Sequence, residues 1–193
     1  MPNNSLIQQH FQASAASISN NLSLEPLIQQ AAEKIYACFE QGGKLMICGN
    51  GGSSADAQHL SAELLNRYHR ERRELPGIAL TTDAATLTAI GNDYDFNEVF
   101  AKQIKALASK NDLLMVITTS GNSANIIQGV AAAHEKSINC IALNGKNGGK
   151  LSNKLKSSDL DIIVNGDVTA RIQEVHGLII HCLCDLIDSY ILD

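Results

Sequence analysis

The chain has no tryptophan, three prolines and little aromatic character, since Phe, Trp and Tyr make up 4% of its 193 residues. It has no excess of positive charge either, because 15 Lys and Arg stand against 20 Asp and Glu, which gives a net charge of -5. Proteins that bind nucleic acid broadly neutralise many phosphates with basic side chains. The composition therefore argues against bulk DNA or RNA binding, and we expect no nucleic acid partner.

The chain also lacks the cysteine pattern of a metal or redox module. Its cysteines are odd in number, contain no CxxC pair and lie mostly in apolar runs: Cys38, Cys48, Cys140, Cys182 and Cys184. We expect them to be reduced core residues. The N-terminal MPNNSLIQQHFQ has neither a charged nor an apolar signal region, and no uninterrupted apolar stretch approaches membrane-spanning length. The sequence thus predicts a cytoplasmic protein with no membrane partner.

What the chain does contain is a regular alternation of apolar runs and helix-length segments. At 45% hydrophobic it can bury one substantial core. The short apolar runs, each an expected strand, are 45–48, 77–80, 113–117, 138–143 and 160–164. Runs this short and this apolar are typical of a parallel sheet covered on both faces. The pattern predicts a three-layer α/β domain.

Helical spacing is expected at both ends of the chain. Residues 4–20 carry a narrow apolar stripe that would cap the core or pack on another subunit. Ser23 is expected to cap a second helix, which ends at Gly42 and Gly43. Residues 170–193 form one long amphipathic helix.

Two loops rich in glycine and hydroxyl side chains follow the first and third expected strands: GNGGSS at 49–54 and TTSGNS at 118–123. Ligands of open parallel sheets bind at the carboxyl ends of the strands. The first loop lacks the closing Gly-Lys-Ser/Thr of a Walker A loop, and Ser54 stands where GxGxxG needs its third glycine. Backbone amides at a helix start, together with hydroxyls, can hold a phosphate without a cation. A small phosphosugar is therefore favoured over a nucleotide, the alternative being that each loop is a tight turn.

Two helices carry pairs of polar residues with metal-binding or acid–base chemistry. His59 and Glu63 are four apart, so they lie on one helix face, and Gln173 and His181 are eight apart, which is about two turns. Each pair alone is also what a solvated helix surface shows.

Four motifs in this order resemble the sugar isomerase (SIS) domain, and within it the sedoheptulose 7-phosphate isomerases. They are GNGGSSADAQH at 49–59, GNDYDF at 91–96, TTSGNSAN at 118–125 and ARIQEVHGLIIH at 170–181, and the resemblance covers essentially the whole chain. It implies a five-stranded parallel, flavodoxin-like sheet flanked by helices, with an extra N-terminal helix. Residues 1–34 would be a helical segment packing on the core and on neighbouring subunits, and residues 35–193 the SIS domain. A homotetramer with active sites between subunits is also implied.

The resemblance implies an enzyme that converts sedoheptulose 7-phosphate to D-glycero-D-manno-heptose 7-phosphate through an enediol, the first step of ADP-heptose synthesis for the lipopolysaccharide core. Glu63 would abstract the carbon proton, and His181 would be the opposing acid or base. One Zn²⁺ per subunit would be held by His59, Glu63, Gln173 and His181. The implied substrate contacts are Asn50, Gly51, Gly52, Ser53, Glu63, Asn92, Asp93, Thr118, Thr119, Ser120, Ser123 and Gln173.

Two features lie outside this pattern. Some family members have Asp before Arg-Ile-Gln where this chain has Ala170, so that role is absent here or filled by Asp167. The basic run 67–73 is interleaved with Glu71, and we expect a solvated or subunit-facing loop. We single out Arg67 as the exception within this run, because it lies one turn beyond Glu63.

Other functions remain open on the sequence. A non-enzymatic branch of the same fold binds the bacterial replication initiator DnaA as a tetrameric scaffold, and CLCDLID at 182–188 resembles that branch. That branch typically lacks the carboxylate at Glu63 and the histidine at His181, and both are present here. A sugar-phosphate sensor, or an isomerase for a different sugar, is a third alternative.

Overall fold

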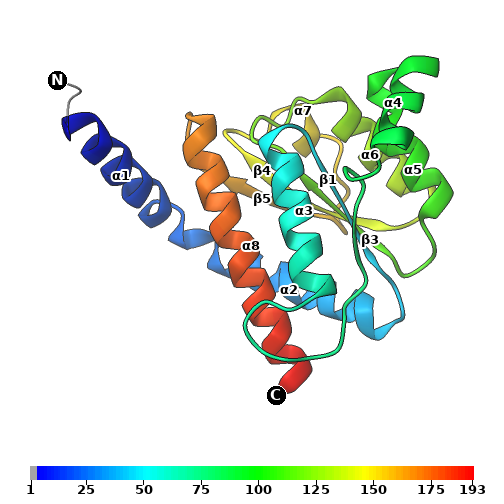
Figure 1. The fold of residues 1–193 in the computed structure, drawn as a ribbon, viewed down its shortest axis with the longest axis horizontal. Coiled ribbons are helices and arrows are strands. Elements are labelled where there is room, and N and C mark those ends of the chain that lie inside the picture. Colours follow the sequence, from blue (N-terminus) through cyan, green and yellow to red (C-terminus); the bar gives the residue numbers. More distant parts are fainter. Residues whose placement is uncertain (1–3) are drawn as a thin grey trace.

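The computed structural model describes residues 4–193 and has a five-stranded parallel sheet at its centre (Figure 1). The strands are β1 (Leu45–Gly49), β2 (Gly77–Ala79), β3 (Leu113–Ile117), β4 (Asn139–Gly145) and β5 (Leu160–Val164). Their order is β2-β1-β3-β4-β5, and every neighbouring pair is parallel. This is the flavodoxin-like order. The predicted fold class is confirmed.

The helices are α1 (Asn4–Ser19), α2 (Glu25–Glu40), α3 (Gly52–Leu65), α4 (Ala84–Asp93), α5 (Val99–Leu107), α6 (Ala124–Glu135), α7 (Gly149–Ser152) and α8 (Thr169–Leu192), with short 3-10 turns η1 (Leu22–Leu24) and η2 (Phe96–Glu98). Every residue of β1 and β3 is buried. Because side chains alternate along a strand, Leu45 and Ile47 join the core on one face of the sheet, while Met46 and Cys48 join the core on the other. Helices α2, α3 and α8 cover the first face, and α5 and α6 cover the second. The three predicted layers are therefore present.

The start of α2 differs from the prediction that Ser23 caps it. The N-cap of α2 is Leu24, and no side chain accepts a capping hydrogen bond there. Ser23 instead lies inside η1, because residues 22–24 form a tight turn between α1 and α2. The predicted end is correct: Gly42 has φ 73° and its N–H donates to the Phe39 carbonyl, a left-handed termination that glycine adopts without strain.

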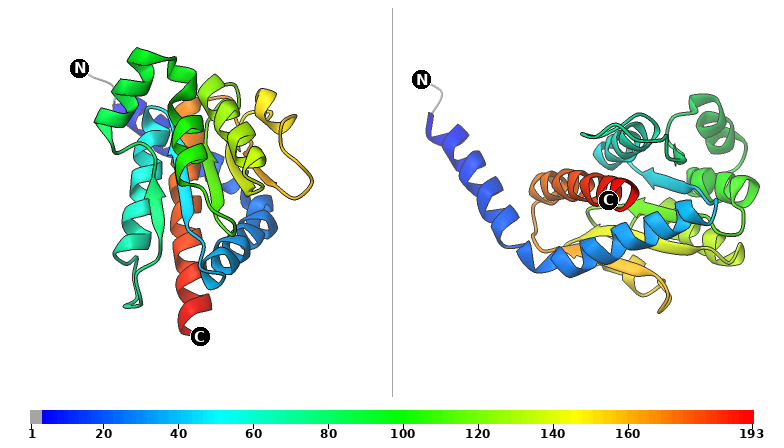
Figure 2. Two further views of the ribbon diagram at one scale, coloured as in Figure 1. Left: turned by 90° about the vertical axis from the view of Figure 1, so that its right-hand side faces the viewer. Right: turned by 90° about the horizontal axis from the view of Figure 1, so that it is seen from below.

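Helix α1 projects away from the sheet and ends beside α8 (Figure 2). Its apolar side chains are largely uncovered: Leu6 is 56% exposed, Ile7 62% and Phe11 75%. The narrow apolar stripe predicted for residues 4–20 is thus present, and it does not face the core of its own chain.

Helix α8 is long and apolar enough to cross a membrane by length and composition, with a mean hydropathy of 1.5 over its most apolar segment. This helix is not an uninterrupted apolar stretch, since Arg171, Glu174 and Asp185 lie within it, so the expectation that the chain has no such stretch stands. Its apolar face nevertheless packs in the main core through Ile172, Ile179 and Ile187. A helix that crosses the centre of a domain passes the same test as a membrane span.

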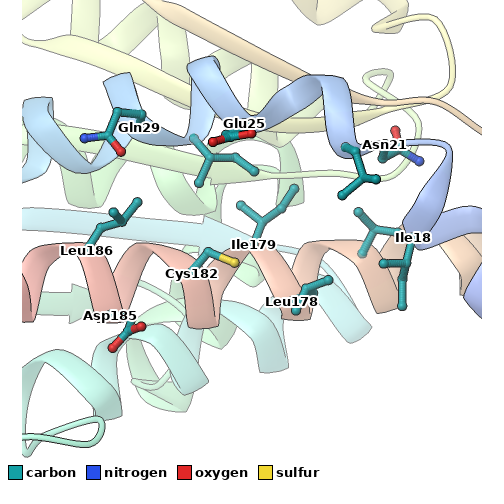
Figure 3. Close-up of a pocket in the computed structure, with 12 residues that line it drawn as sticks. Ile18, Asn21, Glu25, Gln29, Leu178, Ile179, Cys182, Asp185 and Leu186 are labelled. Carbon is teal, nitrogen blue, oxygen red and sulfur yellow. The ribbon is translucent and has the colours of Figure 1, made fainter.

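All five cysteines are free. Cys38, Cys48, Cys140 and Cys184 are buried, as predicted, and burial raises the pKa of the Cys184 thiol to about 12. Cys182 is exposed and lines a groove between the α1–α2 segment and α8, so the prediction of a core position is wrong for this residue (Figure 3).

Candidate active site

The two glycine- and hydroxyl-rich loops lie side by side at the carboxyl ends of β1 and β3, which are neighbours in the sheet. Between them is a cleft of about 200 Å³, lined by Asn50, Ser53, Ile117, Thr118, Thr119, Ser120 and Ser123. Six of these seven residues are polar. The structure thus brings together most of the residues to which the sequence assigned phosphosugar binding in the two loops.

Helices α3 and α6 both begin at this cleft. The N-cap residues are Gly51 and Ser123, and neither makes a side-chain capping hydrogen bond. Gly51 adopts φ 56°, a conformation that favours glycine and that turns the chain sharply from β1 into α3. The first amides of a helix lack intrahelical acceptors and carry partial positive charge. Two such helix starts converging on one polar cleft form a site suited to an anion such as a phosphate.

A pair of asparagines fixes the distance between the loops. Asn50 Nδ2 donates to Asn125 Oδ1, and Asn125 Nδ2 donates to Asn50 Oδ1, each at 2.8 Å. Asn125 is 3% exposed and its Oδ1 also accepts from the Ile126 amide. Asn50 therefore uses its side chain to tie the first loop to α6. The sequence analysis did not single out Asn125, although it lies within the TTSGNSAN motif.

Helices α3 and α8 pack side by side (Figure 1). The imidazoles of His59 and His181 meet edge to face with ring centroids 5.1 Å apart. His59 Nε2 lies 3.3 Å from Glu63 Oε1 one turn along α3. Both of these side chains are partly exposed, at 40% for His59 and 23% for Glu63. Three of the four residues named as metal ligands are therefore grouped where a small molecule can reach them.

Gln173, the fourth, contacts the start of α3. A Cβ added to Gly52 would come within 2.2 Å of Gln173 Nε2, so a side chain at position 52 would displace this glutamine. Gln173 also lies near the carboxyl group of Asp56, which is one turn before His59 on α3. Gln173 and His59 are thus both neighbours of Asp56.

Asp56 is a site residue that the sequence analysis missed. Burial raises the pKa of its carboxyl group, while the neighbouring Gln173 and His59 act in the opposite direction. Asp56 Oδ2 is buried and has no hydrogen-bond partner among residues 4–193. The available signal was spacing, because positions 56, 59 and 63 recur on one face of a helix.

Tyr68 was also missed. Its ring stacks on the imidazole of His181, with centroids 5.4 Å apart and an interplanar angle of 22°. The contact orients His181 from the side of the segment that follows α3.

Asn92 and Asp93, two further predicted substrate contacts, lie at the end of α4. This helix begins just after β2, at the same end of the sheet as the cleft, but none of its residues is buried. Asn92 Nδ2 donates to Asp93 Oδ1 at 2.8 Å. The neighbouring aromatic rings are uncovered, Tyr94 at 67% and Phe96 at 60% exposure.

The basic run differs from its prediction in one place. Arg67 is 49% exposed and pairs with Glu71, as expected of a solvated loop. The side chain of Arg72 is 1% exposed and forms an ion pair with Asp188, whose side chain is 0% exposed. The expectation of a solvated loop is therefore wrong for Arg72, which is buried between α3 and α8.

The α3–α8 cluster has the donor chemistry of a metal site. Two imidazoles and a carboxylate are groups that bind Zn²⁺, and the unpartnered Asp56 oxygen is one more buried acceptor nearby. These residue types are ones that bind zinc, although in residues 4–193 their ligand atoms are not gathered as closely as those of the group described next.

A second group of side chains could also hold a metal: the ligand atoms of His134, Cys140 and Asp159 all lie within 4.8 Å of one another. It lies at the opposite end of the strands from the cleft. The Asp159 carboxylate already accepts from the amides of Cys140 and Lys156 and pairs with His134. Burial raises the pKa of the Cys140 thiol, which disfavours the thiolate that a metal requires.

Comparison with known proteins identifies the family. The SIS domain family matches residues 10–145. The chain is 52% identical over 193 residues to the phosphoheptose isomerase of Thiobacillus denitrificans, covering 100% of this chain and 98% of that one. The solved phosphoheptose isomerase of Francisella tularensis superimposes with a TM-score of 0.92 at 45% identity, covering 98% and 100% of the two chains. That of Neisseria gonorrhoeae, named GmhA, gives a TM-score of 0.90 at 48% identity, covering 96% and 98%. The chain belongs to the SIS domain family and, within it, to the phosphoheptose isomerases.

Proposed function

We propose that this protein interconverts sedoheptulose 7-phosphate and D-glycero-D-manno-heptose 7-phosphate, and so supplies heptose for lipopolysaccharide synthesis. The main support for the proposal is that one loop connects the anion cleft to the group of His59, Glu63 and His181. The loop from Gly49 to Ser54 lines the anion cleft, and the helix that leaves it carries His59 and Glu63 toward His181. A ligand held by its phosphate in the cleft would extend toward a carboxylate and two imidazoles.

The reaction needs two proton transfers. One proton leaves C1 of the ketose and returns to C2, while the hydroxyl proton on O1 is exchanged for one on O2, so that the atoms balance through an enediol. Glu63 is the carboxylate within reach and acts as the base toward carbon. His181, supported by the Tyr68 ring, serves the oxygen atoms. Positioned groups of this kind each contribute roughly 10² to 10⁴ in rate.

Substrate binding relies on donors rather than on cations. The hydroxyls of Ser53, Ser120 and Ser123 line the cleft and can donate to phosphate oxygens, and the starts of α3 and α6 add partial positive charge there. Hydrogen bonds to a charged acceptor are about twice as strong as neutral ones. The cleft thereby selects phosphorylated sugars, and Asn50 contributes through its bond to Asn125.

His59, Glu63, Gln173 and His181 are the proposed ligands of one zinc ion per subunit. Bound there, zinc would polarise the hydroxy-ketone oxygens and stabilise developing negative charge. The support is the donor set of the α3–α8 cluster and the contact of Gln173 with Asp56 beside it.

The protein is proposed to be a homotetramer. An apolar groove of about 420 Å³ runs between the α1–α2 segment and α8, with Leu178, Ile179 and Leu186 along one wall (Figure 3). It continues the exposed stripe of α1, where Phe11 is 75% exposed. Apolar surfaces of this extent rarely stay in water. The groove and the stripe support packing of residues 1–34 against neighbouring subunits, with residues 35–193 as the SIS domain.

Placing the active sites between subunits would also give α4 a role. Asn92 and Asp93 are exposed in one chain, next to uncovered aromatic rings at the end of the sheet that holds the cleft. A second subunit covering this surface would bring these residues toward a bound sugar. Five free thiols suit the reducing conditions of the cytoplasm, the proposed location.

The scaffold alternative is less favoured because a protein that organises DnaA needs neither Glu63 nor His181.

The two functions are separated by incubating purified, zinc-loaded protein with sedoheptulose 7-phosphate, fructose 6-phosphate or ribulose 5-phosphate and following the sugars by NMR. We expect a heptose 7-phosphate from the first sugar and little change in the others. Tight association with DnaA without turnover of any ketose phosphate would support the scaffold instead.

A further inference from the structure

Arg72 is a buried cation in a segment that is otherwise irregular and largely exposed. It lies between the end of α3 and the start of β2, and its side chain is 1% exposed. A guanidinium removed from water must have its donors satisfied. Its hydrogen bonds therefore show what this side chain does.

The guanidinium caps the carboxyl end of α3. Arg72 Nη2 donates to the Glu63 carbonyl at 2.7 Å, and Nη1 donates to the carbonyls of Leu64 at 2.9 Å and Asn66 at 3.2 Å. The last carbonyls of a helix lack intrahelical donors and carry partial negative charge. Arg72 supplies both the donors and the positive charge. It also holds the main chain of Glu63 itself.

The third nitrogen of the guanidinium, Nε, reaches α8. Arg72 Nε lies 2.8 Å from Asp188 Oδ1, and the side chain of Asp188 is 0% exposed. Asp188 is seven residues beyond His181, which is two turns along the same face of the helix. Its second oxygen has no hydrogen-bond partner among residues 4–193, so Arg72 is the cation on which this buried carboxylate depends.

We infer that Arg72, together with Asp188, is a positioning element that sets the distance between Glu63 on α3 and His181 on α8. The planar fork of arginine can reach an aspartate and several carbonyls at once, whereas a lysine ammonium acts as a point charge. Neither Arg72 nor Asp188 touches the substrate in this account. They act through the main chain of Glu63 and the axis of α8. The inference rests on the proposed isomerase function.

A control pair is available in the same segment. Arg70 Nη2 pairs with Asp193 Oδ1 at 2.9 Å, so it also joins this loop to α8, but its side chain is 44% exposed and it contacts no carbonyl of α3 in the described residues. Removing it tests whether any link between loop and helix is enough.

The experiment compares Arg72→Met/Asp188→Leu with Arg70→Met/Asp193→Leu and with the unaltered protein. Replacing both members of a buried ion pair by apolar side chains is often neutral for folding, so the first double variant is expected to stay folded with an unchanged oligomeric state, at a melting temperature lowered by the loss of the hydrogen bonds to the α3 carbonyls. Its kcat is expected to fall about 10- to 100-fold, the scale of a misplacement near 1 Å, while KM changes little because the phosphate cleft lies at the other end of α3. Its affinity for zinc, measured by competition with a chelator, is expected to weaken. The control pair is expected to leave kcat, KM and zinc affinity unchanged, and Arg72→Lys to recover part of the kcat.

Unchanged kcat and zinc affinity in the folded Arg72→Met/Asp188→Leu variant would overturn the inference while leaving the isomerase function intact. An equal loss in the control pair would overturn it as well. If the unaltered protein turns over no ketose phosphate, the proposed function fails, and the zinc affinities alone decide whether Arg72 sets the spacing of the two helices.

Discussion

The imidazole of His59 meets the imidazole of His181 edge to face, with ring centroids 5.1 Å apart, although the two residues come from helices far apart along the chain. Glu63 lies against His59 on the same helix, with 3.3 Å between His59 Nε2 and Glu63 Oε1. The proposed chemistry thus depends on how α3 and α8 pack. Helix α3 also begins, together with α6, at the cleft that is suited to phosphate.

Removing one hydroxyl from the cleft should weaken phosphate binding. Ser120→Ala deletes a donor to a charged acceptor, worth about 1.5–3 kcal/mol, and we expect the affinity for sedoheptulose 7-phosphate to fall roughly tenfold or more. Isothermal titration calorimetry measures the loss. In the unaltered protein, sedoheptulose 7-phosphate should raise the melting temperature far more than unphosphorylated sedoheptulose. Equal shifts for the two sugars would mean that the cleft does not hold the phosphate.

Chelation should lower both activity and thermal stability. A ligand bound by the native state alone stabilises by RT ln(1 + [L]/Kd), which is about 2.7 kcal/mol at a hundredfold excess over Kd. Adding zinc back should restore the melting temperature and the turnover. Substitution of His59 by Ala should remove the response to zinc, whereas substitution of His134 by Ala should retain it. The reverse pattern would indicate that the metal binds to His134, Cys140 and Asp159 instead.

Charges placed on the apolar groove should disrupt the homotetramer. Leu178 and Phe11 are 41% and 75% exposed, and Leu178→Asp or Phe11→Asp would leave a carboxylate buried in any interface formed there. Light scattering is expected to give a smaller species for both. Leu107→Asp, at a leucine 46% exposed on α5, is the matched control and should leave the tetramer intact. A stable species near the 20.7 kDa chain mass for the unaltered protein would contradict the proposal.

Acid should destabilise the protein partly through His176. This residue is fully buried on α8 and pairs through Nε2 with the Asn144 carbonyl, and burial lowers its pKa from 6.5 to about 4. The unfolded chain therefore binds a proton that the folded chain does not, so this residue costs no stability above about pH 6.5. The loss of folding free energy caused by His176 grows as the pH falls from about 6.5 to 4 and reaches roughly 3 kcal/mol. Urea unfolding of His176→Gln across this range should show a shallower loss of stability than the unaltered protein, and parallel curves would refute the assignment.

The sequence predicted the sheet well because its signals are local. Runs such as 113–117 are short, apolar and bounded by helix-length segments, and each became a strand. The two loops were also found from local composition, since hydroxyls and glycines follow β1 and β3 directly. Ser23 was a wrong cap because the turn at residues 22–24 overrides the preference of serine for that position.

The rest depends on tertiary packing that no local pattern encodes. Spacing placed His59 beside Glu63, but only the crossing of α3 and α8 brings His181 to them. From the sequence alone Asp56 is indistinguishable from a surface acid. In the fold it is partly buried and lies next to Gln173 of α8. From the sequence alone Arg72 is one basic residue in a charged loop. Its burial depends on the Glu63 carbonyl and the Asp188 carboxylate, which only the fold brings to it.

We propose that Glu63 performs the carbon proton transfer, and parallel NMR time courses measure this role. Zinc-loaded unaltered protein and Glu63→Gln are each incubated with sedoheptulose 7-phosphate, after calorimetry has shown that both bind the sugar and equal amounts of metal. Glutamine nearly keeps the shape of glutamate but cannot accept the proton. We expect that the unaltered protein forms heptose 7-phosphate, and that Glu63→Gln, like His181→Gln, is slower by about 10² or more. Near-normal formation of heptose 7-phosphate by a folded, metal-loaded Glu63→Gln protein would contradict it.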